Sequence, residues 1–179
     1  MTFEGRNRFP VWSADSQRVA FQSDRGGDLG IFWQRADGTG TAERLTTAEK
    51  GTAHIPESWA PDITRFLYNS ATDQTTTLFA FSVADKKATP FGDVRSPVNR
   101  IMSAVFSPDG RWVAYASSEG RTRAAVYVQP FPATGAKYQV SKNADDGHHP
   151  AWAPDGTALF FTPGPGRLSA VRVVTAPSF

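Results

Sequence analysis

Short apolar runs alternate with polar turns along the whole chain, and the pattern recurs four times. In its third copy, the apolar run 102–106 is followed by the turn Ser-Pro-Asp-Gly at 107–110 and by an alternating segment at 111–116. After a polar loop come two more segments rich in β-formers, 124–131 and 137–141. Such segments, bounded by Gly, Pro and Asp, are typical of β-strands. One copy therefore predicts four antiparallel strands.

The aromatic residue that opens each copy occurs at nearly constant spacing. The phrases WSADSQRVAF, WAPDITRFLY, FSPDGRWVAY and WAPDGTALFF begin at Trp12, Trp59, Phe106 and Trp152, in steps of 47, 47 and 46 residues. A four-stranded unit with this period is typical of a β-propeller blade. We therefore expect an all-β chain, with residues 1–179 forming a single β-propeller that is part of a ring or half of one. Its four blades lie at about 9–46, 55–91, 102–141 and 149–174.

The remaining copies predict strands in the same order. The first copy gives 9–12, 18–22, 30–35 and 43–46, and the second gives 55–59, 65–69, 77–83 and 88–91. The fourth gives only 149–152, 158–162 and 168–174, so we expect the last blade to lack its outer strand in cis.

The repeated residues have structural explanations. We expect the turn aspartates to accept hydrogen bonds from backbone N–H groups of their own turns. They are Asp15, Asp62, Asp109 and Asp155. The repeated tryptophans and Phe106 are expected to pack between blades. Ser16 and Ile63 stand where glycine supplies a left-handed residue in the other copies, and we expect those two turns to be less tight.

The phrases resemble the TolB-like propeller repeat of bacterial proteins. The match rests on FPVW at 9–12, SDRGG at 23–27, IF at 31–32 and HPAWAPDG at 149–156. The segments at 126–132, 160–161 and 167–171 are also similar to C-terminal sensor propellers of bacterial serine/threonine protein kinases. TolB-like propellers also precede prolyl-oligopeptidase-type peptidases. The resemblance implies a soluble protein that is periplasmic or extracytoplasmic if it follows the family.

Composition excludes several classes of function. The chain has no cysteine, which excludes disulfides, thiol catalysis and Cys-ligated zinc. Its 19 Lys and Arg are scattered and nearly balanced by 17 Asp and Glu, so we expect no nucleic-acid partner. No apolar run approaches the ~20 residues of a membrane-spanning helix, and the N-terminus lacks the apolar core of a signal peptide. We therefore expect no membrane association and no export signal.

Loops at one rim of the propeller are the expected place for a binding site, because they differ between copies. The densest cluster is 145–149, where Asp145, His148 and His149 are weak candidates for a divalent metal site. A polar loop is the alternative, because adjacent histidines on a strand point to opposite faces. Arginines in comparable loops either grip an anion or are solvated. The rim candidates are Asp24, Arg25, His54, Glu57, Arg121, Arg123, Asp145, Asp146, His148, His149 and Arg167.

The sequence contains no kinase or peptidase signature and no Gly-x-Ser-x-Gly motif, so we expect a non-catalytic binding module without a cofactor. Its rim would bind a protein, peptide or glycan. One alternative is an accessory or sensor propeller cut from a larger kinase or peptidase. A metal-dependent hydrolase with an axial site is less favoured, because Glu57 is the only acid within an inner strand. We also expect a homo-oligomer in which two four-bladed chains complete an eight-bladed ring.

Overall fold

A computed structural model describes residues 4–97, 102–119, 123–141 and 146–174. Within these ranges the chain forms only strands, and no helix long or apolar enough to cross a membrane occurs there. The strands are β1 Asn7–Trp12, β2 Arg18–Ser23, β3 Gly30–Arg35, β4 Glu43–Arg44, β5 Ala53–Trp59, β6 Arg65–Ala71, β7 Thr75–Ser82, β8 Lys87–Pro97, β9 Val105–Phe106, β10 Trp112–Ser117, β11 Ala125–Pro130, β12 Tyr138–Gln139, β13 His148–Trp152, β14 Ala158–Thr162 and β15 Ser169–Arg172.

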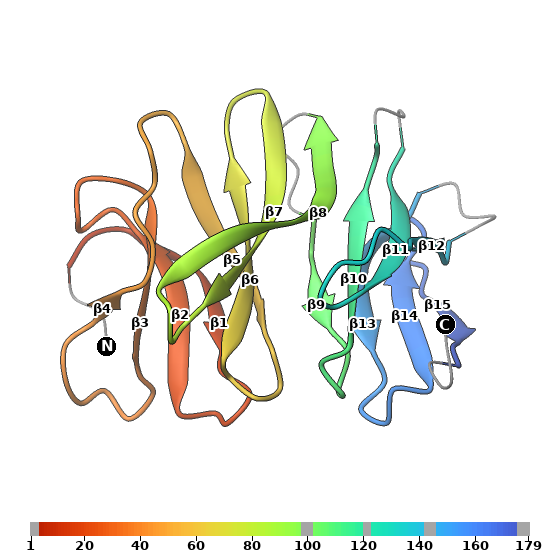
Figure 1. Ribbon diagram of the computed structural model, residues 1–179, viewed down its shortest axis with the longest axis horizontal. Helices are drawn as coiled ribbons and strands as arrows, with labels where there is room; N and C mark the ends of the chain where they lie inside the picture. Colours follow the sequence, from red (N-terminus) through yellow and green to blue (C-terminus); the bar gives the residue numbers. More distant parts are fainter. Residues whose placement is uncertain (1–3, 98–101, 120–122, 142–145, 175–179) are drawn as a thin grey trace.

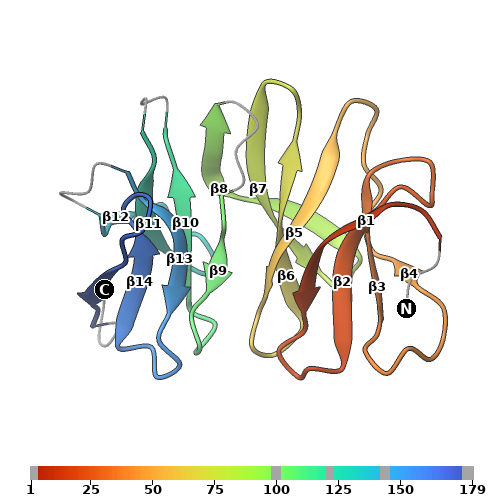
Figure 2. The same cartoon turned by 180° about the vertical axis from the view of Figure 1, so that it is seen from behind.

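The strands pair into four antiparallel sheets in chain order. The sheets contain β1–β4, β5–β8, β9–β12 and β13–β15. They stand side by side from one end of the molecule to the other, with the first and fourth sheets at opposite ends (Figures 1 and 2). This arrangement confirms the predicted all-β propeller blades. Among the described residues the fourth sheet has three strands, as expected.

The inner strand of the third sheet is shorter than predicted. Only Val105–Phe106 pairs with β10, whereas the expected strand began at residue 102. Ser103 has a left-handed backbone with φ of 49°, which breaks the ladder. Met102 is fully buried, and its carbonyl accepts a hydrogen bond from the Ala116 N–H at 2.7 Å. The apolar run 102–106 is therefore core, but only its last two residues are strand.

The outer strand of the second sheet runs farther than predicted. It continues to Pro97 instead of ending at residue 91, and a large bulge interrupts its pairing with β7 between Thr77 and Phe79. Figure 1 shows the two differently directed parts of β8. Phe91 and Val94 lie in the bulge and pack with residues of the third sheet in one buried cluster. The bulge therefore redirects the strand so that its apolar side chains reach the next blade.

The four turns that follow the repeated aromatic residues have the same geometry. In each, the aspartate accepts a hydrogen bond from the backbone N–H two residues later, at 3.0 to 3.1 Å, which confirms the prediction for these aspartates. Ser16 and Ile63 adopt φ of 58° and 56°, close to the 70° of Gly110. Their N–H groups close the turn at 2.9 Å, as that of Gly110 does. The expectation that these two turns are less tight is therefore wrong.

Aromatic packing joins neighbouring sheets. Trp59 of the second sheet stacks on Trp33 of the first, with ring centroids 5.6 Å apart, and both contact the buried Phe66 cluster. Phe106 is buried between the second and third sheets, and Trp152 packs between the third and fourth. These contacts confirm the predicted packing role of the repeated aromatic residues, except for Trp12, which is 58% exposed.

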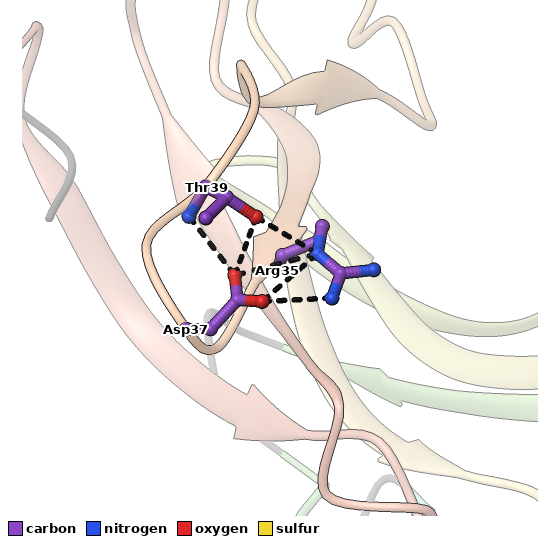
Figure 3. A network of polar contacts seen from close by, with 3 residues as sticks. All are labelled: Arg35, Asp37 and Thr39. Atoms are coloured by element: carbon purple, nitrogen blue, oxygen red, sulfur yellow. Dashed lines mark hydrogen bonds and ion pairs between the residues drawn. The ribbon is translucent and has the colours of Figure 1, made fainter.

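A local polar network closes the loop between β3 and β4 (Figure 3). Asp37 accepts hydrogen bonds from the backbone N–H and the hydroxyl of Thr39 at 2.9 and 2.7 Å, and pairs with the Arg35 guanidinium at 2.7 Å. These contacts hold the pKa of Asp37 far below its usual range, and the hydrogen bond from Arg35 has the largest effect. All three residues are exposed, so the network shapes the loop and contributes little to stability.

Candidate functional site

A groove opens at the rim between the first two sheets. In each sheet, consecutive strands are antiparallel. The loop that joins the second strand to the third therefore lies at the same end of the molecule as the loop that leads from one sheet into the next. Three such segments, 27–29, 48–53 and 71–73, line a groove of about 650 Å³ together with Ile55. The predicted rim is therefore hollowed at one place by loops from both sheets.

Hydrogen bonds between the sheets fix the floor of this groove. The His54 N–H donates to the Leu29 carbonyl at 2.9 Å, and Leu29 pairs with Ala53 in an isolated parallel bridge. The Gln22 side-chain amide donates to the His54 carbonyl at 2.9 Å. The Thr46 hydroxyl accepts from the backbone N–H of Ile31 at 2.9 Å. The backbone on both sides of the groove is thus held by hydrogen bonds, and those of Leu29 and Gln22 with His54 join the two sheets.

His54 supports the groove from below. Its ring is buried, lies 4.8 Å from the Tyr68 ring, and has Nδ1 2.9 Å from the Thr46 hydroxyl. Burial lowers the pKa of His54 to about 4, although the nearby Asp28 carboxylate acts in the opposite direction. The imidazole is therefore neutral at physiological pH.

The groove combines an apolar floor with a charged mouth. Ala48, Ile55 and Ala71 are buried in the floor, and Leu29 is 40% exposed beside them. The charged residues of the lining are Asp28, Glu49, Lys50 and Asp73. Arg44 forms an ion pair with Asp28, which leaves two acidic residues and one lysine at the mouth. The groove therefore suits a segment with apolar side chains and at least one positive charge.

Asp24 and Arg25 brace the N-terminal segment. Asp24 Oδ1 accepts a hydrogen bond from the Arg6 N–H at 2.7 Å. Arg25 donates to Asn7 Oδ1 at 3.2 Å, and its guanidinium lies 5.4 and 5.3 Å from the rings of Phe21 and Phe32. The side chain of Arg25 therefore covers the outer face of the first sheet and does not line the groove.

Glu57 lies between the second and third sheets. It occupies the bulge between Pro56 and Ser58 of β5 and accepts a hydrogen bond from the Asn69 amide. Burial raises the pKa of Glu57 to about 8, although hydrogen bonds from nearby N–H groups, including that of Ser103, act to lower it. The carboxyl group is thus directed at the backbone of the next blade.

The predicted Asp/His cluster is only partly within the described residues, because Asp145 lies outside them. Asp146 accepts a hydrogen bond from the Ala124 N–H at 2.8 Å, and its other oxygen lies 2.9 Å from His148 Nε2. Partial burial acts to raise the Asp146 pKa, but these hydrogen bonds lower it overall. His149 is exposed, with φ of 50°, and its ring centroid is 6.1 Å from that of His148. Within the part of the chain that the structure describes, no three potential ligands gather as a metal site.

Of the remaining arginine candidates, the two that the structure describes, Arg123 and Arg167, do not line the groove either. Arg121 lies outside the described residues. Arg123 and Arg167 are exposed on loops of the third and fourth sheets, where the Arg167 N–H donates to the Gly164 carbonyl at 3.3 Å.

Sequence reasoning placed His54 at the rim but did not name the second sheet's loop at 71–73, which lines the groove. Its position after the second strand of the repeat was the available signal. The small floor residues Ala48 and Ala71 carry no chemical signal in the sequence.

Comparisons with known proteins identify the architecture. No protein-family model matches the chain. The structure of TolB from Acinetobacter baumannii superposes with a TM-score of 0.75 at 18% identity, over 93% of this chain and 40% of that one. The putative TolB from Agrobacterium tumefaciens gives the same TM-score at 20% identity, over 90% of this chain and 56% of that one. The chain has the TolB-like β-propeller fold.

Sequence relatives include a TolB protein and a peptidase. The Tol-Pal system protein TolB of Alcanivorax borkumensis is 40% identical over 62 residues, which are 35% of this chain and 14% of that protein. The uncharacterized peptidase YuxL of Bacillus subtilis is 27% identical over 161 residues, 89% of this chain and 22% of that protein. A prolyl endopeptidase structure matches with a TM-score of 0.60 at 12% identity, over 87% of this chain and 24% of that one. The TolB-like chain therefore spans less than a quarter of the length of either sequence relative.

Proposed function

We propose that this TolB-like chain is a non-catalytic binding module whose rim groove takes an extended peptide segment of a partner protein. The observation that carries the proposal is the groove between the first two sheets, with its apolar floor and its mixed, net acidic mouth. Binding sites of this kind combine an apolar lining with a few placed polar groups. Among the described residues that line the groove, none is aromatic and could stack on a sugar ring, which favours a peptide over a glycan.

The surroundings of the groove support binding rather than catalysis. Its neighbouring titratable ring, His54, is buried below the floor and held against Thr46 and Tyr68. A catalytic base must reach the proton that it removes from a bound substrate. The described serine–aspartate pairs, such as Ser107 with Asp109 at 2.5 Å, belong to the turns at the opposite rim. Each of these contacts has a structural role.

A second candidate function is an accessory propeller of a larger peptidase. The similarity to YuxL covers 89% of this chain but only 22% of that protein. Such unequal coverage is typical of a single domain compared with a longer protein that contains a similar domain. In that case the groove would present a peptide to a catalytic domain. Both functions require peptide binding in the groove, so the same experiment addresses them.

The experiment is selection from a phage-displayed random dodecapeptide library, followed by affinity measurement with synthesised, fluorescein-labelled peptides. We expect the selected peptides to combine Leu or Val with Lys or Arg. Leu29→Asp and Asp73→Lys should each weaken binding about tenfold or more, since a central contact contributes at least ~1.4 kcal/mol. Leu168→Asp is the matched control, because Leu168 is 73% exposed on the fourth sheet's loop. Equal affinities for wild type and Leu29→Asp would contradict the proposal.

A further inference from the structure

The second and third sheets of the chain each pack against a neighbouring sheet on both faces. Residues that are paired across antiparallel strands point to the same face. In the second sheet, Trp59 pairs with Phe66 on the face toward the first sheet, and Leu67 lies on the face toward the third. We call the face toward the preceding sheet the leading face and the opposite one the trailing face. Every junction within the chain joins a trailing face to a leading face.

The leading face of the first sheet is only partly covered by the described residues, since Arg25 lies over its Phe21 and Phe32 but the area around Trp12 is open. It contains Trp12, which pairs with Val19 just as Trp59 pairs with Phe66. Trp12 is 58% exposed, whereas Trp59 is 6% exposed. Val19 is half-buried, whereas its counterparts in the later sheets are at most 1% exposed. They are Phe66, Val113 and Leu159.

A shallow depression marks this face. It has a volume of about 410 Å³, and its lining includes Pro10, Trp12, Val19 and Phe21. At the junction between the first two sheets the corresponding position is filled by the trailing face, where Trp33 of the first sheet stacks on Trp59. The lining also includes Arg8, Gln34 and Arg35, so the depression has the position of an inter-blade contact and an apolar part around Trp12.

The matching trailing face lies at the other end of the molecule, on the fourth sheet. Its central residue is Phe160, which pairs with Ala151 and Ala170. Phe160 is half-buried and both alanines are exposed. The counterparts of Phe160 in the first three sheets are completely buried. They are Ala20, Leu67 and Ala114. Val174, on the same side as Ala170 by alternation, is 63% exposed.

The two end faces resemble the pairs of faces that pack together at the junctions within the chain. In the second sheet the trailing face pairs a large Leu67 with a small Ala80, and this face receives Phe106 and its neighbours. The fourth sheet repeats the combination with Phe160 and Ala170. The first sheet offers Trp12, the counterpart of Phe106. By analogy with these junctions, a trailing face would cover the first sheet and a leading face would cover the fourth.

We propose that a second copy of this chain covers both end faces, with the fourth sheet of each copy packed on the first sheet of the other. The pair is closed, with eight sheets in one ring and no end face left exposed. A second copy is the favoured partner because the complementary face is present on the same chain. A closed pair with twofold symmetry satisfies both ends at once.

The test is the mass in solution at micromolar concentrations, measured by light scattering after gel filtration. Wild type should have twice the chain mass of 19.5 kDa, that is 39 kDa. Trp12→Asp and Phe160→Asp should each give 19.5 kDa with an unchanged far-ultraviolet circular dichroism spectrum. Leu29→Asp, which changes an apolar residue that is 40% exposed between the first two sheets, should remain at 39 kDa.

Mixing the two monomeric variants makes the test specific. The Trp12→Asp chain keeps its fourth sheet intact and the Phe160→Asp chain keeps its first, so the mixture has one unaltered junction and should regain a mass of 39 kDa. A wild-type mass of 19.5 kDa would overturn the proposal and leave further propeller blades as the cover. Loss of pairing with Trp12→Asp but not with Phe160→Asp would also overturn it, since that result indicates first sheets packed on each other. Loss of peptide binding in Leu29→Asp has no bearing on these masses.

Discussion

Replacement of Glu57 by glutamine should make the protein more stable at alkaline pH and leave its stability at pH 5 nearly unchanged. The carboxyl group is enclosed between the second and third sheets, and burial raises its pKa from 4.5 to about 8. In the folded protein the group is therefore protonated up to about pH 8, whereas the unfolded chain releases the proton above pH 4.5. Unfolding then releases a proton, so this group's contribution to stability is complete below pH 4.5 and is lost as the pH rises to 8.

The size of the effect follows from the pKa change. Each unit of difference between folded and unfolded states corresponds to about 1.36 kcal/mol, so the rise from 4.5 to about 8 gives at most about 5 kcal/mol. Glutamine is never ionised and has nearly the same shape. Asn69 Oδ1 is buried without a hydrogen-bond partner among the described residues, and it belongs to the amide that already contacts Glu57. After that amide turns over, Oδ1 can accept a hydrogen bond from a protonated Glu57 or from the glutamine that replaces it.

The assay is urea unfolding of wild type and Glu57→Gln at pH 5, 6.5 and 8, with stabilities compared at each pH. The difference between the two proteins isolates Glu57, because all other titrating groups are common to both. It should grow by several kcal/mol from pH 5 to 8. Glu49→Gln, which changes an exposed carboxylate at the rim, should follow wild type at every pH. A constant difference between wild type and Glu57→Gln would refute the reasoning, because Glu57 would then be ionised in the fold.

Two further predictions concern the turns and the buried histidine. Ser16→Gly replaces a non-glycine residue that has a left-handed backbone and should raise the stability by up to about 1 kcal/mol. Gly110→Ala should lower the stability by ~1–2 kcal/mol. The reason is that Gly110 has φ of 70° and that the new Cβ would lie 3.3 Å from Pro61 Cδ. Thermal unfolding should show these opposite shifts; shifts in the same direction would contradict the argument. Because burial lowers the pKa of His54 to about 4, its contribution to stability is complete above pH 6.5 and falls by up to about 3 kcal/mol as the pH drops to 4. NMR titration should find the ring neutral at pH 5, and a midpoint near 6.5 would contradict this.

The fold could be predicted because each repeat encodes its own local structure. Asp109 and Gly110 specify a turn within four residues, and alternation specifies β10 and β11 beside it. The end of β8 could not be read in the same way. Gly92 and Asp93 look like a turn, but the strand continues because Phe91 and Val94 are buried against the third sheet. That burial depends on a neighbouring blade and leaves no signal in the local pattern.

The candidate site was predicted only in outline, for the same physical reason. The rim position of the loop before His54 follows from strand order alone. The direction of Arg25 does not, because its guanidinium lies over Phe21 and Phe32, which belong to different strands. The groove floor at Ala48 and Ala71 is equally hidden, since small side chains form a hollow only where larger neighbours surround them. Sequence thus indicates which loops meet, and tertiary packing decides which side chains line the site.

The contrast between Trp12 and Trp59 is the strongest physical reason to expect a cover on the first sheet. The two residues occupy equivalent positions, yet one is 58% exposed and the other 6%. For a side chain that can bury about 200 Å², the difference is about 100 Å², or about 2.5 kcal/mol of burial for each junction. Two junctions would gain about 5 kcal/mol from tryptophan alone, near the lower end of the ~4–15 kcal/mol that association costs in lost freedom. Stable pairing therefore also requires the apolar area around Val19 and Phe160, and a single aspartate at Trp12 should suffice to separate the chains.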